Sequence, residues 1–224
     1  FGSQLQEILD VPVGIINTSW GGSSVQAWIS KEVMTTFETV NITEEQLQKG
    51  KANSTPTALF NSMLNPLIPY TIKGVLWYQG ESNNDHAKQY ETLFPAFVKM
   101  VQQKSENENL PFYYAQIAPY TYTNGAIETA PVYNSAYLRD AQRKALKLIN
   151  NGGMVSLMDI GEEFSIHPAQ KEVGGNRFAY MALAKTYGLK GFGYDAPLYD
   201  SMSIAGNVIT IKFTNASNGL MATN

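Results

Sequence analysis

The sequence predicts an α/β fold in which helices cover a parallel sheet. Short apolar runs without charges alternate with longer segments that carry apolar residues at helical spacing. Such apolar runs are typical of strands buried on both faces of a sheet. Small and polar residues follow several of the runs directly, before a helical segment begins. Strand, polar loop and helix in that order favour parallel strands joined by helical crossovers.

Composition agrees with a globular chain and excludes several functions. The 224 residues are 44% hydrophobic and carry a net charge of −3, which is enough material for a real core. No basic stripe indicates nucleic-acid binding, and no apolar run approaches the ~20 residues of a membrane span. The absence of cysteine excludes a disulfide, a cysteine-zinc site and a thiol nucleophile.

The best-defined unit is Lys73–Asn84, with the sequence KGVLWYQGESNN. Its apolar half, Val75–Tyr78, predicts a buried strand, and a helix is expected from about Ala87. The polar half, Gln79–Asn84, lies between them. Ligands bind outside the carboxyl ends of the strands in open α/β sheets. We therefore expect this loop to form half of an active site.

Other segments fill out the fold. Three more are predicted as buried strands, namely Val13–Asn17, Phe112–Ile117 and Met154–Ile160. Val208–Phe213 alternates at period two, which indicates a half-exposed antiparallel strand. This change of period predicts a main domain over residues 1–196 and the start of a β-rich module over residues 197–224.

Five segments are predicted as helices, covering residues 1–9, 57–67, from about 87 onward, 136–149 and 176–187. The second should stop before Pro66, and Pro95 should kink or divide the third. His86 stands at the start of the third helix, where it is expected to be solvated rather than catalytic.

Three polar loops carry candidate groups for acyl transfer. Gly21 and Gly22 can expose backbone N–H groups to a developing oxyanion; the alternative is a plain turn beside a core Trp20. The Gln79 side chain is a second candidate donor. His167, one of only two histidines, is a candidate general base.

Two amides lie among the apolar residues of predicted helices, Asn61 and Gln142. A polar side chain on an apolar face needs a hydrogen-bond partner. Each therefore either faces the site or is a satisfied core amide.

Five blocks, in collinear order over about residues 1–195, resemble the sialate O-acetylesterase family, the SASA branch of the SGNH hydrolases. They are NTSWGGSSVQAW, LFNSMLNPL, IKGVLWYQGESNN, YLRDAQRKAL and SIHPAQKEVGGNRFAYMALAKTYG. The resemblance implies a flavodoxin-like three-layer α/β/α sandwich. It also implies a serine esterase without metal or other cofactor that removes O-acetyl groups from sugars, typically sialic acid.

The resemblance assigns roles to individual residues. His167 of the IHP motif matches the catalytic histidine. Gly21 or Gly22 matches the glycine of the oxyanion hole, with a slight preference for Gly22. Gln79 stands where SGNH enzymes commonly have an asparagine that donates to the oxyanion.

Supporting roles follow from the same resemblance. Glu81 would orient sugar hydroxyls or neighbouring loops, and Trp20 lies in the block that holds the oxyanion glycine. Arg139 and Gln142 match an LREAQ-like helix, which would turn them toward the site. Asn61 lies in the LFNSMLNPL block.

The chain departs from the family pattern at the nucleophile. The family's GQSNM motif, with its catalytic serine and first strand, does not occur here. We expect that segment upstream of Phe1, on a companion chain or in a part of a longer protein. Ser19 and Ser82 are poor substitutes, because the resemblance gives them roles in supporting loops.

A second departure concerns the acid that orients the histidine. Many SGNH enzymes have an aspartate three residues before it, where this chain has Phe164. The remaining candidates are Glu162, Glu163 and Asp159, or a backbone carbonyl, and a Ser–His dyad is an alternative.

Three functions are consistent with these observations. The leading one is hydrolysis of O-acetyl esters of sialic acid, and the second is the same chemistry on acetylated xylan or another polysaccharide. The third is a non-catalytic carbohydrate-binding module, which suits the missing serine and the aromatic residues Trp20, Tyr120 and Tyr122. The family leads us to expect a secreted, periplasmic or lysosomal protein.

Overall fold

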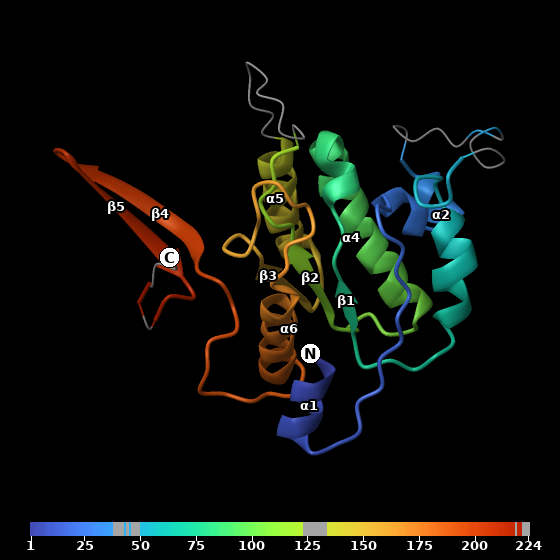
Figure 1. Ribbon diagram of the computed structural model, residues 1–224, viewed down its shortest axis with the longest axis horizontal. Coiled ribbons are helices and arrows are strands. Elements are labelled where there is room, and N and C mark those ends of the chain that lie inside the picture. The colour runs from blue at the N-terminus through green and yellow to red at the C-terminus, as the bar shows by residue number, and fades with distance from the viewer. Residues whose placement is uncertain (38–42, 44, 46–49, 123–133, 218, 221–224) are drawn as a thin grey trace.

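A three-stranded parallel sheet forms the centre of the molecule (Figure 1). The computed structural model describes residues 1–37, 43, 45, 50–122, 134–217 and 219–220. The strands run in the order β1-β2-β3 and comprise Val75–Trp77, Phe112–Gln116 and Gly152–Ser156. In register, Phe112 lies opposite Val75 on one side and Gly152 on the other. The predicted parallel sheet is confirmed.

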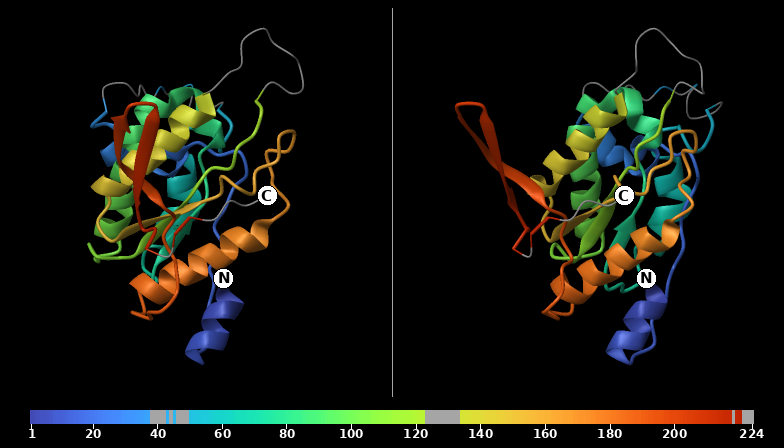
Figure 2. Two further views of the ribbon diagram at one scale, coloured as in Figure 1. Left: turned by 90° about the vertical axis from the view of Figure 1, so that its left-hand side faces the viewer. Right: turned by 60° about the vertical axis from the view of Figure 1, so that its left-hand side comes forward.

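Helices cover both faces of this sheet (Figures 1 and 2). On one face α4 (Ala87–Lys104) and α5 (Asn134–Ala145) pack over Phe112 and Tyr114. On the other face α6 (Lys171–Lys185) and α1 (Gly2–Leu9) pack over Tyr113 and Ala115. Successive side chains of a strand point to opposite faces, so β2 contributes to two separate cores. The α/β sandwich that the sequence predicts is therefore confirmed.

An aromatic cluster fills the core beneath α4. The ring of Phe94 lies 4.8 Å from that of Tyr114 and 5.2 Å from that of Tyr90, measured between centroids. Trp77 of β1 lies 4.6 Å from Phe97. These separations are within the range of favourable aromatic pairs.

Helix α4 continues through Pro95. The expectation that proline divides this helix is wrong. Proline has no N–H to donate to the carbonyl of Glu91, one turn earlier. The helix persists because its predicted apolar stripe is buried; the stripe comprises Tyr90, Leu93, Phe94, Phe97, Val98 and Val101.

Short helical turns connect the larger elements. They are η1 (Val25–Trp28), α2 (Lys31–Met34), η4 (Glu81–His86) and η5 (Leu146–Leu148). The single helix predicted over residues 57–67 is instead a π-helical turn, η2 (Phe60–Leu64), followed by a 3₁₀ turn, η3 (Asn65–Leu67). Pro66 lies inside the 3₁₀ turn, so the expectation that the helix stops before it is wrong. Proline is tolerated at this position because the first residues of a helical turn have no hydrogen-bond partner for their N–H groups.

Two predicted boundaries and one predicted strand differ from the structure. The strand predicted over Met154–Ile160 is β3, which begins at Gly152 and ends at Ser156. The helix predicted from residue 176 is α6, which begins at Lys171 and includes Gly174 and Gly175. Residues 13–17 are extended but form no strand within the described residues. Ile15 and Ile16 are 67% and 51% exposed, so the expectation of a buried strand here is wrong. A strand requires a neighbouring strand for its backbone hydrogen bonds.

The C-terminal region forms an antiparallel hairpin of β4 (Leu198–Ala205) and β5 (Val208–Thr214). It projects from the sandwich (Figure 1). The antiparallel strand predicted from period two is confirmed, but the expectation that it is half-exposed is wrong, because every residue of β5 is exposed. A separate module over residues 197–224 stays a prediction. No helix in the described part of the chain is long and apolar enough to span a membrane.

Replacing Phe94 by alanine should lower the free energy of unfolding by about 3–5 kcal/mol. The ring is fully buried, so its removal leaves a cavity among four aromatic neighbours. Urea denaturation measures the change. Tyr70→Ala is the control, since Tyr70 is 62% exposed and its loss should stay within about 0.5 kcal/mol. Equal losses in the two variants would contradict the described core.

Candidate active site

Three loops meet at the edge of the sheet where the strands end. The first, residues 18–24, contains the two adjacent glycines. The second, residues 78–86, follows β1, and the third, residues 157–170, follows β3. Hydrogen bonds and charges connect the second loop to both of the others.

Gln79 joins the first loop to the second. Its Nε2 donates to the carbonyl of Ser23 at 2.8 Å and to Oδ1 of Asn83 at 2.7 Å. Tyr90 donates its hydroxyl to Gln79 Oε1 at 3.2 Å. The side chain is only 7% exposed, and both of its N–H groups are directed to protein acceptors. To donate to an oxyanion, Gln79 must release one of them.

Asn83 extends this connection, and sequence reasoning missed it. Its Oδ1 accepts a hydrogen bond from the backbone N–H of Val25 at 2.9 Å, and its Nδ2 donates to Gln26 Oε1 at 2.9 Å. Asn83 is 1% exposed. A polar residue in a polar loop carries no periodic signal, so only its place in the polar segment Gln79–Asn84 could have indicated it.

Gln142 lies beneath the site and supports it. Its Oε1 accepts from the backbone N–H of Ile117 at 3.0 Å, while its Nε2 donates to the carbonyls of Gln79 at 3.2 Å and Ala115 at 3.3 Å. The residue is fully buried, so the interpretation as a satisfied core amide is correct. Asn61 is exposed on η2, and for this residue that interpretation is wrong.

The two glycines lie in an open part of the first loop. Gly22 has a φ of +66°, and a side chain at Gly21 would meet no atom within 4 Å. Asn53 Nδ2 donates to the carbonyl of Gly22 at 3.1 Å. Among the described residues, neither glycine N–H donates a hydrogen bond to the protein. Trp20 is 49% exposed, so the alternative of a turn around a core tryptophan is wrong.

His167 lies exposed in the third loop, and its positive charge acts on the carboxyl group of Glu81 in the second loop. Burial raises the pKa of the Glu81 carboxyl, while the positive charges of Lys171 and His167 oppose that rise. Lys171 Nζ is 3.4 Å from the Tyr78 hydroxyl and 4.9 Å from the centre of its ring. Burial, reinforced by Glu81, raises the pKa of Tyr78 to about 12, so this hydroxyl stays protonated at neutral pH.

The three acids proposed to orient His167 have other surroundings. Asp159 forms a two-point ion pair with Arg177, at 2.7 and 2.6 Å, which lowers the pKa of Asp159. Glu162 Oε1 accepts from the backbone N–H of Ala169 at 2.6 Å, and Glu163 is exposed. None of the three hydrogen-bonds to His167 within the described residues, so the orienting acid stays a prediction.

Arg139 and Tyr122 add unpaired polar atoms beside this cluster. Among the described residues, Arg139 Nη1 and the Tyr122 hydroxyl are both buried without a hydrogen-bond partner. Burial raises the pKa of Tyr122 above its ordinary range, and Glu81 raises it further while Arg139 lowers it. Both groups can donate hydrogen bonds to a substrate oxygen.

Within the described residues, neither of the two serines considered as substitutes hydrogen-bonds to His167. Ser19 Oγ donates to Oδ1 of Asn17 within its own loop, and Ser82 is exposed in η4. In the ranges that the structure describes, no cluster of three or more histidine, aspartate and glutamate side chains is placed to bind a metal ion.

Comparison with known proteins identifies the class to which this fold and site belong. Residues 1–183 match the family described as carbohydrate esterase, sialic acid-specific acetylesterase. The chain therefore belongs to the sialic acid-specific acetylesterase family, as the sequence blocks predicted.

Particular relatives support this assignment. Sialate O-acetylesterase of Mus musculus is 26% identical over 99% of this chain and 46% of its own length. The Homo sapiens protein of the same name is 27% identical over 96% of this chain and 43% of its own. The crystal structure of a novel carbohydrate acetylesterase from Xanthomonas citri has a TM-score of 0.79 and 31% identity, over 95% of this chain and 45% of that one. The chain thus spans less than half the length of these relatives.

Replacing Glu81 by glutamine should stabilise the protein more at neutral than at acidic pH. The unfolded chain loses the Glu81 proton near the ordinary pKa of 4.5, whereas the folded protein retains it to higher pH. The unfolded state then binds fewer protons, so the wild-type free energy of unfolding falls as pH rises through this window. Glutamine removes that fall.

Thermal denaturation of both proteins at about pH 4 and about pH 7 measures this difference. The change in melting temperature caused by Glu81→Gln should be more positive at the higher pH. The exposed Glu163→Gln is the control and should show no such trend. A difference that shrinks with rising pH would show that Glu81 is not held in a low-dielectric environment.

Proposed function

We propose that the intact protein containing this chain is a carbohydrate O-acetylesterase that works through a serine acyl-enzyme. The observation that carries the proposal is the convergence of three loops, joined by the bond from Gln79 to Ser23 and by the interaction of Glu81 with His167. Together they hold backbone N–H groups, a side-chain amide and a histidine at one edge of the sheet. These are the groups that acyl transfer requires.

In this mechanism His167 removes the proton from the serine as the hydroxyl attacks the acetyl carbonyl. The N–H of Gly22 and the amide of Gln79 stabilise the resulting oxyanion. The sugar leaves with the proton from His167, which then activates a water molecule to release acetate. Glu81 stabilises the positively charged imidazole through its negative charge.

The serine is supplied by a segment outside these 224 residues, upstream in a longer protein or on a companion chain. The free side of β1 supports this proposal. Among the described residues, β1 pairs only with β2, and Leu76 of β1 is 41% exposed. The extended residues 13–17 also expose Ile15 and Ile16.

A parallel strand added beside β1 would pair with the backbone groups along its free edge. It would end at the same edge as the three loops and bring a serine after its last residue close to His167. Intact-mass measurement and N-terminal sequencing of the purified protein test this directly, because a GQSN-like segment must be present in any active preparation. An active preparation without one would contradict the proposal.

O-acetylated sialic acid is the proposed substrate, since the curated relatives carry that name. The 31% identical structure is described only as a carbohydrate acetylesterase. The alternative substrate is therefore another acetylated sugar, such as xylan. Acetate release from O-acetylated sialic acid and from acetylated xylan distinguishes the two. Sugar binding without any acetate release would instead indicate a non-catalytic binding module. A secreted, periplasmic or lysosomal location remains part of the proposal.

Replacing His167 by alanine in the intact enzyme should abolish nearly all acetate release, because the mechanism assigns removal of the serine proton to this side chain alone. His86→Ala is the matched control; His86 is the other histidine and lies at the end of η4. That variant should keep wild-type turnover. Full activity in His167→Ala would refute the mechanism.

Replacing Gln79 by alanine should reduce kcat by about 10²–10³-fold with little change in KM, as expected for the loss of one oxyanion donor. Gln102→Ala is the control, because Gln102 is an equally buried glutamine that donates to Leu110 and Asn150 away from the loops. Steady-state kinetics on both variants separate the outcomes. If the two variants lose activity equally, Gln79 acts through folding alone.

A further inference from the structure

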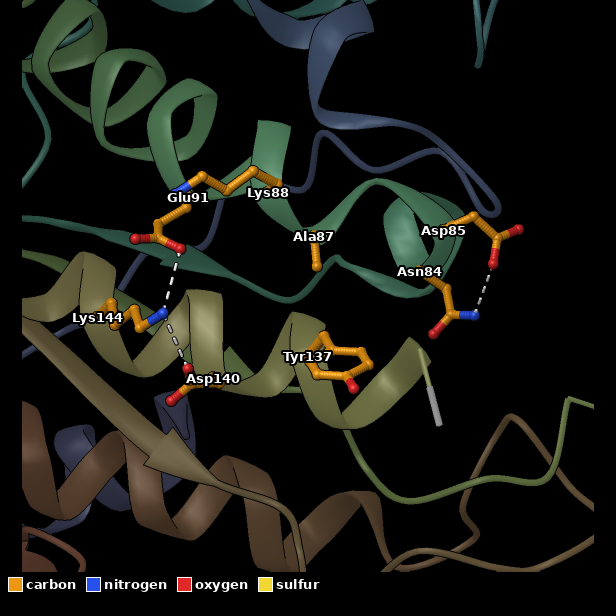
Figure 3. Close-up of a pocket in the computed structure, with 8 residues that line it drawn as sticks. All are labelled: Asn84, Asp85, Ala87, Lys88, Glu91, Tyr137, Asp140 and Lys144. Carbon is orange, nitrogen blue, oxygen red and sulfur yellow. Dashed lines mark hydrogen bonds and ion pairs between the residues drawn. The ribbon is translucent and has the colours of Figure 1, made fainter. Parts of the chain in front are cut away.

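A cavity of about 420 Å³ lies between the start of α4 and the exposed side of α5 (Figure 3). The second site loop continues into one wall, which consists of Asn84, Asp85, Lys88 and Glu91. The cavity therefore lies next to the candidate active site and contains none of the groups assigned to the reaction. Its volume is sufficient for a sugar ring.

Asn84 is the buried polar group of this cavity. The residue is 7% exposed, and its Oδ1 has no hydrogen-bond partner in the part of the chain that the structure describes. Its Nδ2 donates to Oδ1 of Asp85 at 3.4 Å, and Figure 3 shows the carboxamide oxygen turned toward the side of Tyr137. A buried acceptor without a donor is unfavourable. A ligand that supplies an O–H group there removes that cost.

The opposite wall is an aromatic ring with charged groups beside it. Tyr137 of α5 is 68% exposed, although it lines the cavity. Asp140 and Lys144 follow it at successive turns of the same helix. A flat aromatic ring with a few polar groups nearby is a common way to bind a small polar molecule that also has an apolar face. A sugar ring has a face of C–H bonds and a rim of hydroxyl groups.

The charged side chains that line the cavity favour a neutral sugar over an anionic one. Lys144 Nζ already contacts Asp140 at 3.0 Å and Glu91 at 3.4 Å. With Asp85 and Lys88, the lining carries three carboxylates and two ammonium groups. An anionic ligand would meet a net negative charge and would offer acceptors where Asn84 needs a donor.

From these observations we propose that the cavity binds a neutral sugar ring, with Tyr137 as the stacking surface and Asn84 as an acceptor for a sugar hydroxyl. Binding itself does not depend on the proposed function. If the protein is an esterase, the cavity holds a neutral residue of the glycan next to the acetylated sugar. It would then contribute to the choice of polysaccharide or glycan.

The test is a titration of the intact protein with two neutral oligosaccharides, xylotetraose and lactose, followed by NMR or calorimetry. At least one should bind saturably, and Tyr137→Ala should weaken that binding about tenfold, as expected for the loss of an aromatic anchor. Tyr137→Phe keeps the ring and should bind like the wild type. Tyr199→Ala removes a similarly exposed tyrosine from the distant hairpin and should change nothing.

Three results would overturn the inference. They are no binding of either oligosaccharide, equal binding by Tyr137→Ala and wild type, or tighter binding of N-acetylneuraminic acid than of the neutral probes at Tyr137. His167→Ala should leave binding intact while removing acetate release. Loss of hydrolysis and loss of this binding site are therefore measured separately.

Discussion

Hydrogen bonds of buried side-chain amides connect the strand ends to the loops that carry the candidate site. The positions of the other groups in the site depend on these hydrogen bonds. Gln142 joins the ends of β1 and β2, and Gln79 and Asn83 join the loop after β1 to residues 23–26. Losing one partner of such a buried group costs about 1–3 kcal/mol. The loops therefore have as definite a geometry as the core beneath them. Reactive groups on loops need this support, because small displacements reduce catalysis strongly.

The same hydrogen-bond network positions the Glu81 carboxylate so that it interacts electrostatically with Lys171 and His167. Glu81 begins the turn directly after Gln79 and Gly80, and its partial burial is set by how that turn is fixed. Lys171 at the start of α6 and His167 in the loop before it bring compensating positive charge from the other side of the sheet. The electrostatics of the site thus depend on the turn after β1 and on the segment around the start of α6, which come together only in the folded state.

Local patterns predicted the parts of the structure that local interactions determine. The strands at 75–77 and 112–116 and the stripe on α4 follow directly from apolar periodicity. Residues 13–17 have the same apolar character but no partner strand in the described part, and pairing is a non-local property. The sequence likewise left Gln142 undecided, and the electrostatic interaction of Glu81 with His167 joins loops that are far apart along the chain. The sequence blocks located the loops of the candidate site. The hydrogen bonds between these loops could be identified only from the three-dimensional structure.

The β4–β5 hairpin affects how the protein behaves in solution. One face of the hairpin exposes large apolar side chains, because Met202 lies opposite Ile211 and Ile204 opposite Ile209. Within the described residues each strand pairs only with the other, so both outer edges offer unpaired backbone groups. Such edges promote association between copies, and a two-stranded hairpin has little stability of its own. Copies of these 224 residues would therefore associate through residues 198–214 while the sandwich remained folded, and the association would appear as turbidity that increases with protein concentration.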